Sequence, residues 1–161
     1  MSGLTTIRFT FLTATSGSAK KLQQRAGCTS QKDMVDMALA YYAYYAKGVE
    51  GSGEELVSVD RRQQEAEELN DEPTPAHREA GNLEVTVDDD FIKTLTAFTD
   101  NSQPADTLTR ALVLLEDICD AHDKGHEIGL MDEDESEITI LNFTKSTGSS
   151  PGLPPPKHRL H

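Results

Sequence analysis

The chain is poor in several features that define large classes of proteins. It has only two cysteines in 161 residues, too few for the disulfide framework of a small secreted protein. It has no apolar run of about 18 residues, and no charged-then-apolar leader precedes the first predicted strand. We therefore expect a cytoplasmic protein that does not contact a membrane.

Basic residues are also scarce. Lys and Arg together number 15 against 28 Asp and Glu, and the resulting net charge of -13 argues against a surface that attracts nucleic acid or anionic lipid everywhere. The deficit is uneven along the chain. Residues 1–48 contain six basic and two acidic residues, a net charge of +4, whereas the remainder carries -17.

The sequence does contain one order of patterns that occurs twice. In the first occurrence, alternating apolar and polar residues predict a strand at Thr5–Phe11. A short helix at 19–27 follows, and then a long helix from Ser30, a suitable N-cap, to about residue 48. A short strand is predicted at 55–60.

In the second occurrence, the strand is predicted at Leu83–Val87 and the short helix at 88–101. The long helix at 102–125 starts with Ser102 and Pro104, and a hairpin is expected to join residues 127–131 to 137–143. The helices of the two occurrences register at an offset of 73 residues. The shared order of strand, short helix, long helix and strand indicates an internal repeat.

These patterns divide the chain into four parts. The first repeat spans residues 4–60, and the second spans 82–143, including the C-terminal hairpin. Residues 61–81 are polar and acidic with two prolines, which predicts a linker. Residues 144–161 are rich in Ser, Gly and Pro, which predicts a disordered tail.

The segments 4–48 and 82–124 resemble the ribbon-helix-helix family, which includes the MetJ and Arc repressors. In that family two modules intertwine and their strands pair as an antiparallel ribbon. A lone two-stranded ribbon or a lone short helix is marginal in water, and this chain carries both modules. The resemblance implies an α+β, mainly α fold: an intrachain pseudo-dimer with one two-stranded antiparallel ribbon, two long helices packed together, and short extra strands after each long helix.

Ribbon-helix-helix repressors place outward strand residues in the major groove of duplex DNA and hold phosphates at the start of the long helix. By position, the resemblance assigns the ribbon contacts to Thr6, Arg8, Thr10, Glu84 and Thr86. It assigns the phosphate clamps to Thr29, Ser30, Gln31 and Lys32 in the first repeat and to Ser102 and Gln103 in the second. It therefore implies a DNA-binding transcriptional regulator, in which Glu84 would repel the DNA backbone.

The charge distribution leaves a second hypothesis open. The acidic second half also fits a ribbon-helix-helix pseudo-dimer converted to a protein-interaction module, such as an antitoxin, an antirepressor or an adaptor. Such a module would bind a basic protein partner and no DNA. Under either hypothesis, pseudo-dimers can associate into a homo-oligomer.

No catalytic, cofactor or metal site is predicted. The Ser and Cys residues have neither a glycine elbow nor a positioned histidine, so we expect the protein not to be an enzyme. Cys119, His122 and His126 have helical spacing, but Gly125 should end the helix before His126. The acidic run at 131–137 lacks the glycine and ligand order of a calcium loop. The tyrosines at 41–45 are predicted to lie in the core.

Overall fold

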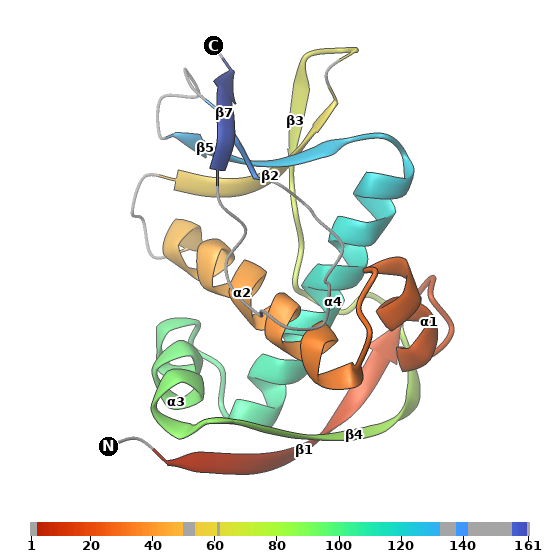
Figure 1. Cartoon of the computed structure of the whole chain (residues 1–161), viewed down its shortest axis with the longest axis vertical. Coiled ribbons are helices and arrows are strands. Elements are labelled where there is room, and N and C mark those ends of the chain that lie inside the picture. Colours follow the sequence, from red (N-terminus) through yellow and green to blue (C-terminus); the bar gives the residue numbers. More distant parts are fainter. Residues whose placement is uncertain (1–2, 50–53, 61, 133–137, 142–155, 161) are drawn as a thin grey trace.

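The computed structural model describes residues 3–49, 54–60, 62–132, 138–141 and 156–160. In chain order its elements are β1 (Leu4–Thr13), α1 (Ala19–Arg25), α2 (Gln31–Val49), β2 (Glu54–Asp60), β3 (Glu65–Glu68), β4 (Arg78–Asp88), α3 (Asp89–Phe98), α4 (Pro104–Asp123), β5 (Glu127–Asp132), β6 (Ile138–Leu141) and β7 (Pro156–Leu160). Helices α2 and α4 lie in the middle of the molecule. A two-stranded sheet lies at one end of them and a five-stranded sheet at the other (Figure 1).

Strands β1 and β4 form the two-stranded sheet, an antiparallel ribbon. Its register pairs Ile7 with Val85 and Arg8 with Glu84. Successive side chains of a strand point to opposite faces, so one face of the ribbon turns toward the helices and the other toward solvent. The inward residues include Phe9, Phe11, Val85 and Val87, all of them buried. The predicted pairing of these two strands is found in the structure.

The helices begin where the sequence offers a suitable residue. The side chains of Ser18 and Asp88 accept hydrogen bonds from backbone N–H groups in the first turns of α1 and α3. Pro104 occupies the first turn of α4, where the N–H group that proline lacks has no helical partner. Helices α2 and α4 pack against each other, and α4 also packs on β1. Their fully buried residues include Met34, Ala38, Tyr41, Leu108, Leu112 and Leu115.

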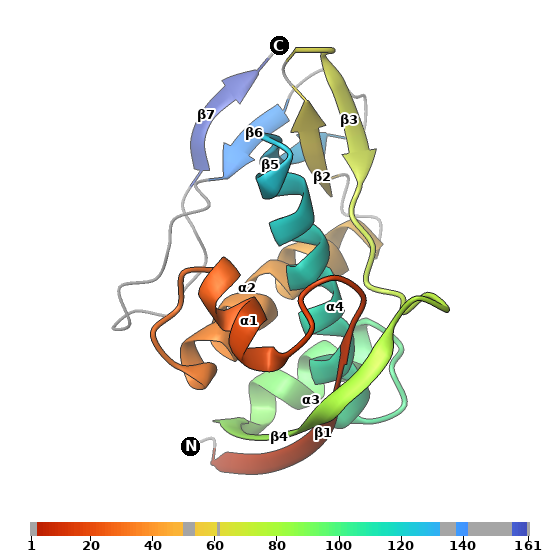
Figure 2. The same cartoon turned by 90° about the vertical axis from the view of Figure 1, so that its right-hand side faces the viewer.

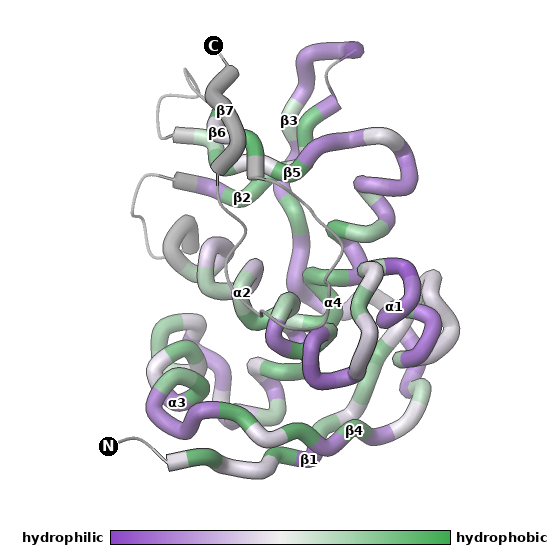
Figure 3. Tube along the Cα trace, in the orientation of Figure 1, coloured by the Kyte–Doolittle hydropathy of each residue, from purple (hydrophilic) through white to green (hydrophobic). Residues whose placement is uncertain are grey.

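The five-stranded sheet is antiparallel, with the strand order β3-β2-β5-β6-β7. One face joins the main core through Leu56 and Ile128, and the alternate residues Val57, Val59 and Ile140 form a second small cluster. Strand β3, with the sequence EAEE, is fully exposed at one edge, where its charge discourages pairing with another chain. Figure 2 shows the sheet across the end of α4 that lies away from the ribbon, and Figure 3 shows the hydrophilic colour of β3.

The prediction of a mainly α fold with a single two-stranded ribbon is wrong, because the chain forms two antiparallel sheets. The short strands predicted after the two long helices pair with each other, so that Leu56 of β2 lies opposite Leu130 of β5. Strand β3 comes from the predicted linker at 61–81, and β7 from the predicted disordered tail. Both are polar edge strands, whose sequences lack the alternation that reveals a half-buried strand.

The C-terminal hairpin was predicted more closely. Strands β5 and β6 pair antiparallel, with Ile128 opposite Leu141. A Cβ atom at Gly129 would lie 2.8 Å from Cγ2 of Ile138, so the two strands approach as only glycine allows. Residues 133–137 and 142–143 of the predicted hairpin, and 144–155 and 161 of the predicted tail, lie outside the described residues.

Candidate functional site

The outer face of the ribbon is a row of polar side chains that point away from the helices. Three contacts join the two strands across this face: Thr6 Oγ1 lies 3.0 Å from Thr86 Oγ1, Arg8 Nη2 donates to Glu84 Oε2 at 3.3 Å, and Thr10 Oγ1 donates to Asn82 Oδ1 at 3.3 Å. These six side chains form the outer ladder of the ribbon. They offer both donors and acceptors to whatever approaches this face.

All five ribbon residues that the sequence predicted lie in the outer ladder, and their contact with DNA stays a prediction. Asn82 is an additional member. It was missed because the strand was predicted to begin at Leu83, whereas β4 begins at Arg78 and pairs Asn82 with Thr10. Counting outward in steps of two from Thr86 and Glu84 would have reached Asn82.

Arg8 and Glu84 are the charged pair in the outer ladder. Their side chains are 75% and 58% exposed. An ion pair this exposed contributes only about 0–1 kcal/mol, so the guanidinium can exchange Glu84 for a stronger acceptor at little cost. Such an acceptor is the O6 and N7 edge of guanine, which Arg contacts with two hydrogen bonds.

The side chains of Thr29, Ser30 and Lys32 at the start of α2, the first predicted phosphate clamp, already have partners within the chain. The Ser30 hydroxyl accepts the N–H of Asp33 at 3.1 Å, and Thr29 donates to Oδ2 of Asp33 at 3.0 Å. Lys32 donates to Oδ2 of Asp36 at 3.1 Å, one turn along the helix. Gln31 is the first residue of α2. Lys32 and Thr86 line the same pocket, so this end of α2 lies beside the ribbon.

The start of α4, the second predicted clamp, has a different chemistry. Ser102 and Gln103 are exposed, and Gln103 makes no side-chain capping bond. Asp106 lies in the first turn, where a carboxylate is favourable for the helix but repels a phosphate. The start of α4 is therefore less suited to binding a phosphate than the start of α2.

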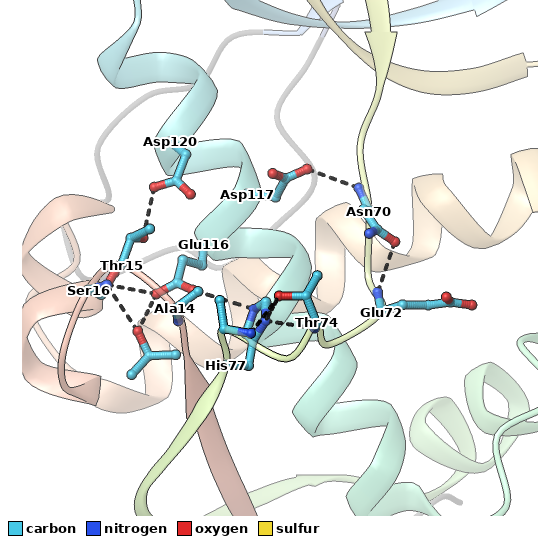
Figure 4. Close-up of polar contacts among 12 residues, drawn as sticks. Ala14, Thr15, Ser16, Asn70, Glu72, Thr74, His77, Glu116, Asp117 and Asp120 are labelled. Carbon is cyan, nitrogen blue, oxygen red and sulfur yellow. Dashed lines mark hydrogen bonds and ion pairs between the residues drawn. The ribbon is translucent and has the colours of Figure 1, made fainter.

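A buried carboxylate fixes the end of the ribbon strand β1. Glu116, in the middle of α4, is 2% exposed. It accepts hydrogen bonds from the Thr13 hydroxyl and from the backbone N–H groups of Ala14 at 2.8 Å and Ser16 at 3.0 Å (Figure 4). Burial alone would raise the pKa of Glu116, but these hydrogen bonds outweigh it and hold the pKa below its usual value.

The segment between β3 and β4, residues 69–77, crosses α2 and α4 and is fixed to both, and we name it the strap. His77 Nε2 lies 3.7 Å from Oε1 of Glu116, and the Asn70 N–H donates to Asp117 of α4 at 3.0 Å (Figure 4). Asp71 is 5% exposed and accepts the Tyr42 hydroxyl of α2 at 2.7 Å. The strap therefore fixes the chain just before β4, in the same way that Glu116 fixes the chain at the end of β1.

Sequence reasoning missed these anchoring residues. Asp71 and His77 fall in a stretch whose composition is that of a linker, and Glu116 is one acidic residue among several on α4. The sequence signal that could have identified Glu116 is its position, because it places a carboxylate on the apolar face of a predicted helix. Glu116 follows Leu115 and precedes Ile118 by two residues.

Arg25, one of the basic residues of the first repeat, is not free to meet an anion. Its guanidinium contacts Asp120 at 2.6 Å and Asp123 at 2.8 Å, which ties α1 to the end of α4. Burial lowers the pKa of Arg25, but the two carboxylates outweigh burial, and the pKa lies above its usual value. The basic residues available near the ribbon are therefore fewer than the sequence count suggests.

The described residues contain no group of three or more His, Cys, Asp and Glu side chains placed to hold a metal ion. Cys28 and Cys119 are both buried free thiols. Within the same ranges, no helix combines the length and the apolar character needed to cross a bilayer.

Comparison with protein-family models, with curated proteins and with solved structures found no match for the chain.

Proposed function

We propose that the protein binds duplex DNA through the outer ladder of the β1–β4 ribbon. The observation that carries the proposal is the ladder itself, a solvent-facing set of polar side chains on a two-stranded ribbon. The major groove of B-DNA admits a two-stranded ribbon, and each base pair presents donors and acceptors there. Arg8 suits guanine, Asn82 suits adenine, and the threonine hydroxyls suit either bases or phosphate.

The distribution of charge supports the ribbon end as the DNA-facing end. Residues 3–36 and 78–88 contain six basic and five acidic residues, a net charge of +1, whereas the rest of the chain carries -14. One of the six, Arg25, is paired with Asp120 and Asp123. An approaching phosphate backbone is therefore repelled least at the ribbon. Lys32, beside the ribbon, would have to exchange Asp36 for a phosphate.

Glu84 sets the strength of this binding. In the free protein it neutralises Arg8, and in a complex it would lie close to the DNA backbone. We therefore expect modest affinity that falls with added salt. Because the steepness of that fall is proportional to the number of phosphate contacts, and few basic residues are available here, the fall should be shallow.

The test is selection of preferred sequences from random duplexes at low salt, followed by fluorescence anisotropy with the full chain. We expect Arg8→Ala to lower the affinity for the selected sequence about tenfold or more, the effect of losing one guanine contact. Glu84→Gln should raise affinity, because it removes the competing negative charge. Arg62→Ala is the matched control, because Arg62 is an exposed arginine in the turn between β2 and β3. These two strands lie at the end of the molecule away from the ribbon (Figure 1).

Two outcomes would overturn the proposal. One is the absence of binding even at low salt. The other is an equal loss of affinity for the Arg8 and Arg62 variants, which would mean that DNA meets the protein without preference for the ribbon.

A further inference from the structure

A polar pocket of about 190 Å³ opens on the five-stranded sheet, at the end of the molecule away from the ribbon (Figure 2). Its walls come from β2, from β3, from the turn that joins them, and from the turn that leads from α4 into β5. The lining residues are Ser58, Asp60, Gln63, Glu65, Glu67 and His126. This volume suits the head group of a ligand, because pockets that enclose a whole drug-sized molecule measure about 300–1,000 Å³.

The register of β2 and β3 gathers acidic residues on one face of the sheet. Ser58 lies opposite Glu67, and Asp60 lies opposite Glu65. Since side chains alternate along a strand, all four share that face. Like charges that lie directly opposite on neighbouring strands destabilise a sheet, so Asp60 and Glu65 repel each other in the free protein. A cation between them would turn this repulsion into attraction.

The carboxylates of the pocket have little compensation within the chain. Oδ2 of Asp60 lies 3.7 Å from Nε2 of His126, and Oδ1 accepts the Arg62 N–H at 3.0 Å. Glu65 and Glu67 make no hydrogen bond or ion pair with any residue that the structure describes. Because neither Lys nor Arg lines the pocket, its interior is strongly negative and attracts a cation.

A buried hydroxyl belongs to the same lining. Ser58 is 5% exposed, and strand alternation turns its side chain to the face of Asp60. Its hydroxyl makes no hydrogen bond within the described part of the chain. Buried polar groups nearly always have a partner, so the partner of this hydroxyl must come from the pocket. Charge on an edge strand protects the strand from pairing, but that protection requires no buried hydroxyl beside the charges.

The spacing of the acceptors favours an organic cation over a metal ion. Among the described residues, no three or more His, Cys, Asp and Glu side chains are placed to hold a metal. The carboxylates therefore surround the pocket without converging on one point. A guanidinium presents five N–H donors in one plane, so it can face acceptors on several sides and form paired hydrogen bonds with a carboxylate.

We propose that this pocket binds the guanidinium group of a small molecule or of an arginine side chain. Glu65 and Glu67 accept its N–H groups from β3, and Asp60 accepts from β2. The Ser58 hydroxyl accepts a further N–H from the buried side of the pocket. The five-stranded sheet thus carries a binding site of its own, at the end of the molecule opposite the outer ladder.

The probe is ethylguanidinium, and its control is ethylurea, which has nearly the same shape and no charge. Amide NMR shifts of the full chain at constant ionic strength measure the affinity and locate the contact. We expect millimolar binding of ethylguanidinium, about tenfold or more tighter than ethylurea, because only the cation compensates the carboxylates. Agmatine and N-acetylarginine amide carry the same head group as a free small molecule and as a peptide side chain, and the tighter of the two identifies the source.

Substitutions then identify the pocket. Glu65→Gln should weaken ethylguanidinium about threefold or more, the effect of losing one exposed carboxylate partner. Glu68→Gln is the matched control, because Glu68 is exposed on the same strand but does not line the pocket. Ser58→Ala should also weaken binding. Without ligand it should leave the midpoint of thermal unfolding unchanged, since its hydroxyl has no hydrogen bond in the chain to lose.

Three results would overturn the proposal: equal binding of ethylguanidinium and ethylurea, equal effects of the Glu65 and Glu68 substitutions, or a clear loss of stability in Ser58→Ala, which would show that the hydroxyl already has a partner in the chain. Displacement of ethylguanidinium by an equal concentration of Mg²⁺ or Ca²⁺ would assign the pocket to a metal ion instead. None of these results depends on whether the ribbon binds DNA.

Discussion

The segments β1–α1–α2 and β4–α3–α4 share an order of elements but connect ribbon to helix differently. Strand β4 runs directly into α3, with Asp88 as the N-cap. Strand β1 instead leaves through a loop at 14–18, and Glu116 of the other segment holds that loop. Both α1 and α3 start with a cap of their own, but the loop that leads into α1 depends on the other segment for its shape, whereas no loop separates β4 from α3.

The same difference accounts for a groove of about 520 Å³ between α2 and the start of α3. Helices α2 and α4 begin 73 residues apart, at Gln31 and Pro104, so Ala43 of α2 corresponds to Glu116 of α4. Glu116 is covered by the loop that follows β1, whereas Ala43 lines the open groove. Because β4 has no loop before α3, the equivalent space stays open. A similar order of elements thus yields a closed anchor on one side and an open groove on the other.

The largest expected effect comes from breaking the anchor. Glu116→Leu leaves the Thr13 hydroxyl and the Ala14 N–H group without an acceptor in a buried site, while the Ser16 N–H keeps only the Thr13 oxygen. We expect a loss of about 3 kcal/mol or more in the free energy of unfolding. Urea denaturation followed by circular dichroism measures it. Glu116→Gln keeps the shape and one acceptor oxygen, so its loss should be clearly smaller. Equal losses for the two variants would show that packing rather than acceptor chemistry holds the loop.

The second effect is a dependence of stability on pH. Because the folded-state pKa of Glu116 is lowered, its contribution to stability is complete above the ordinary pKa of glutamate and is lost as the pH falls through the lowered value. Glu116→Gln should therefore flatten the acid side of a plot of unfolding free energy against pH.

Asp117, the next residue, provides a control of opposite sign. Burial raises its pKa, so its ionised form destabilises the fold as the pH rises toward and through that raised value. Asp117→Asn should steepen the acid side of the same plot. If both variants change the slope in one direction, the assignment of these two carboxylates is wrong.

The smallest effect compares the starts of the two long helices. Ser30→Ala removes the hydroxyl that accepts the Asp33 N–H and should cost about 1 kcal/mol. Gln103→Ala should change stability by only a few tenths of a kcal/mol, since Gln103 makes no capping bond. Thermal unfolding of both variants decides the point, and a Gln103 loss as large as that of Ser30 would contradict the difference between the two starts.

The sequence predicts those parts of the fold in which the pattern of apolar and polar residues shows which side chains are buried. Ile7, Phe9 and Phe11 alternate with polar residues, and this pattern revealed the ribbon and most of its outer ladder. Strand β3 is exposed on every side chain and therefore left no pattern. Leu69 and Asp71 are buried, although they lie in a polar stretch whose composition favours a linker. Their burial depends on tertiary contacts with α2 and α4, which the composition does not reveal. Strands β2 and β5 lie about 70 residues apart in the chain, and nothing in either strand's sequence identifies the other as its pairing partner.

The register of the ribbon also has a consequence for how the chain folds. Its paired residues are separated by between 65 positions, for Thr13 and Arg78, and 84, for Leu4 and Asp88. Contacts this distant form late and slow the overall reaction. During synthesis, Phe9 and Phe11 have no strand to pair beside until β4 has left the ribosome. For that interval the N-terminal part is a nascent chain with exposed aromatic side chains, the state that chaperones bind and that aggregates most readily.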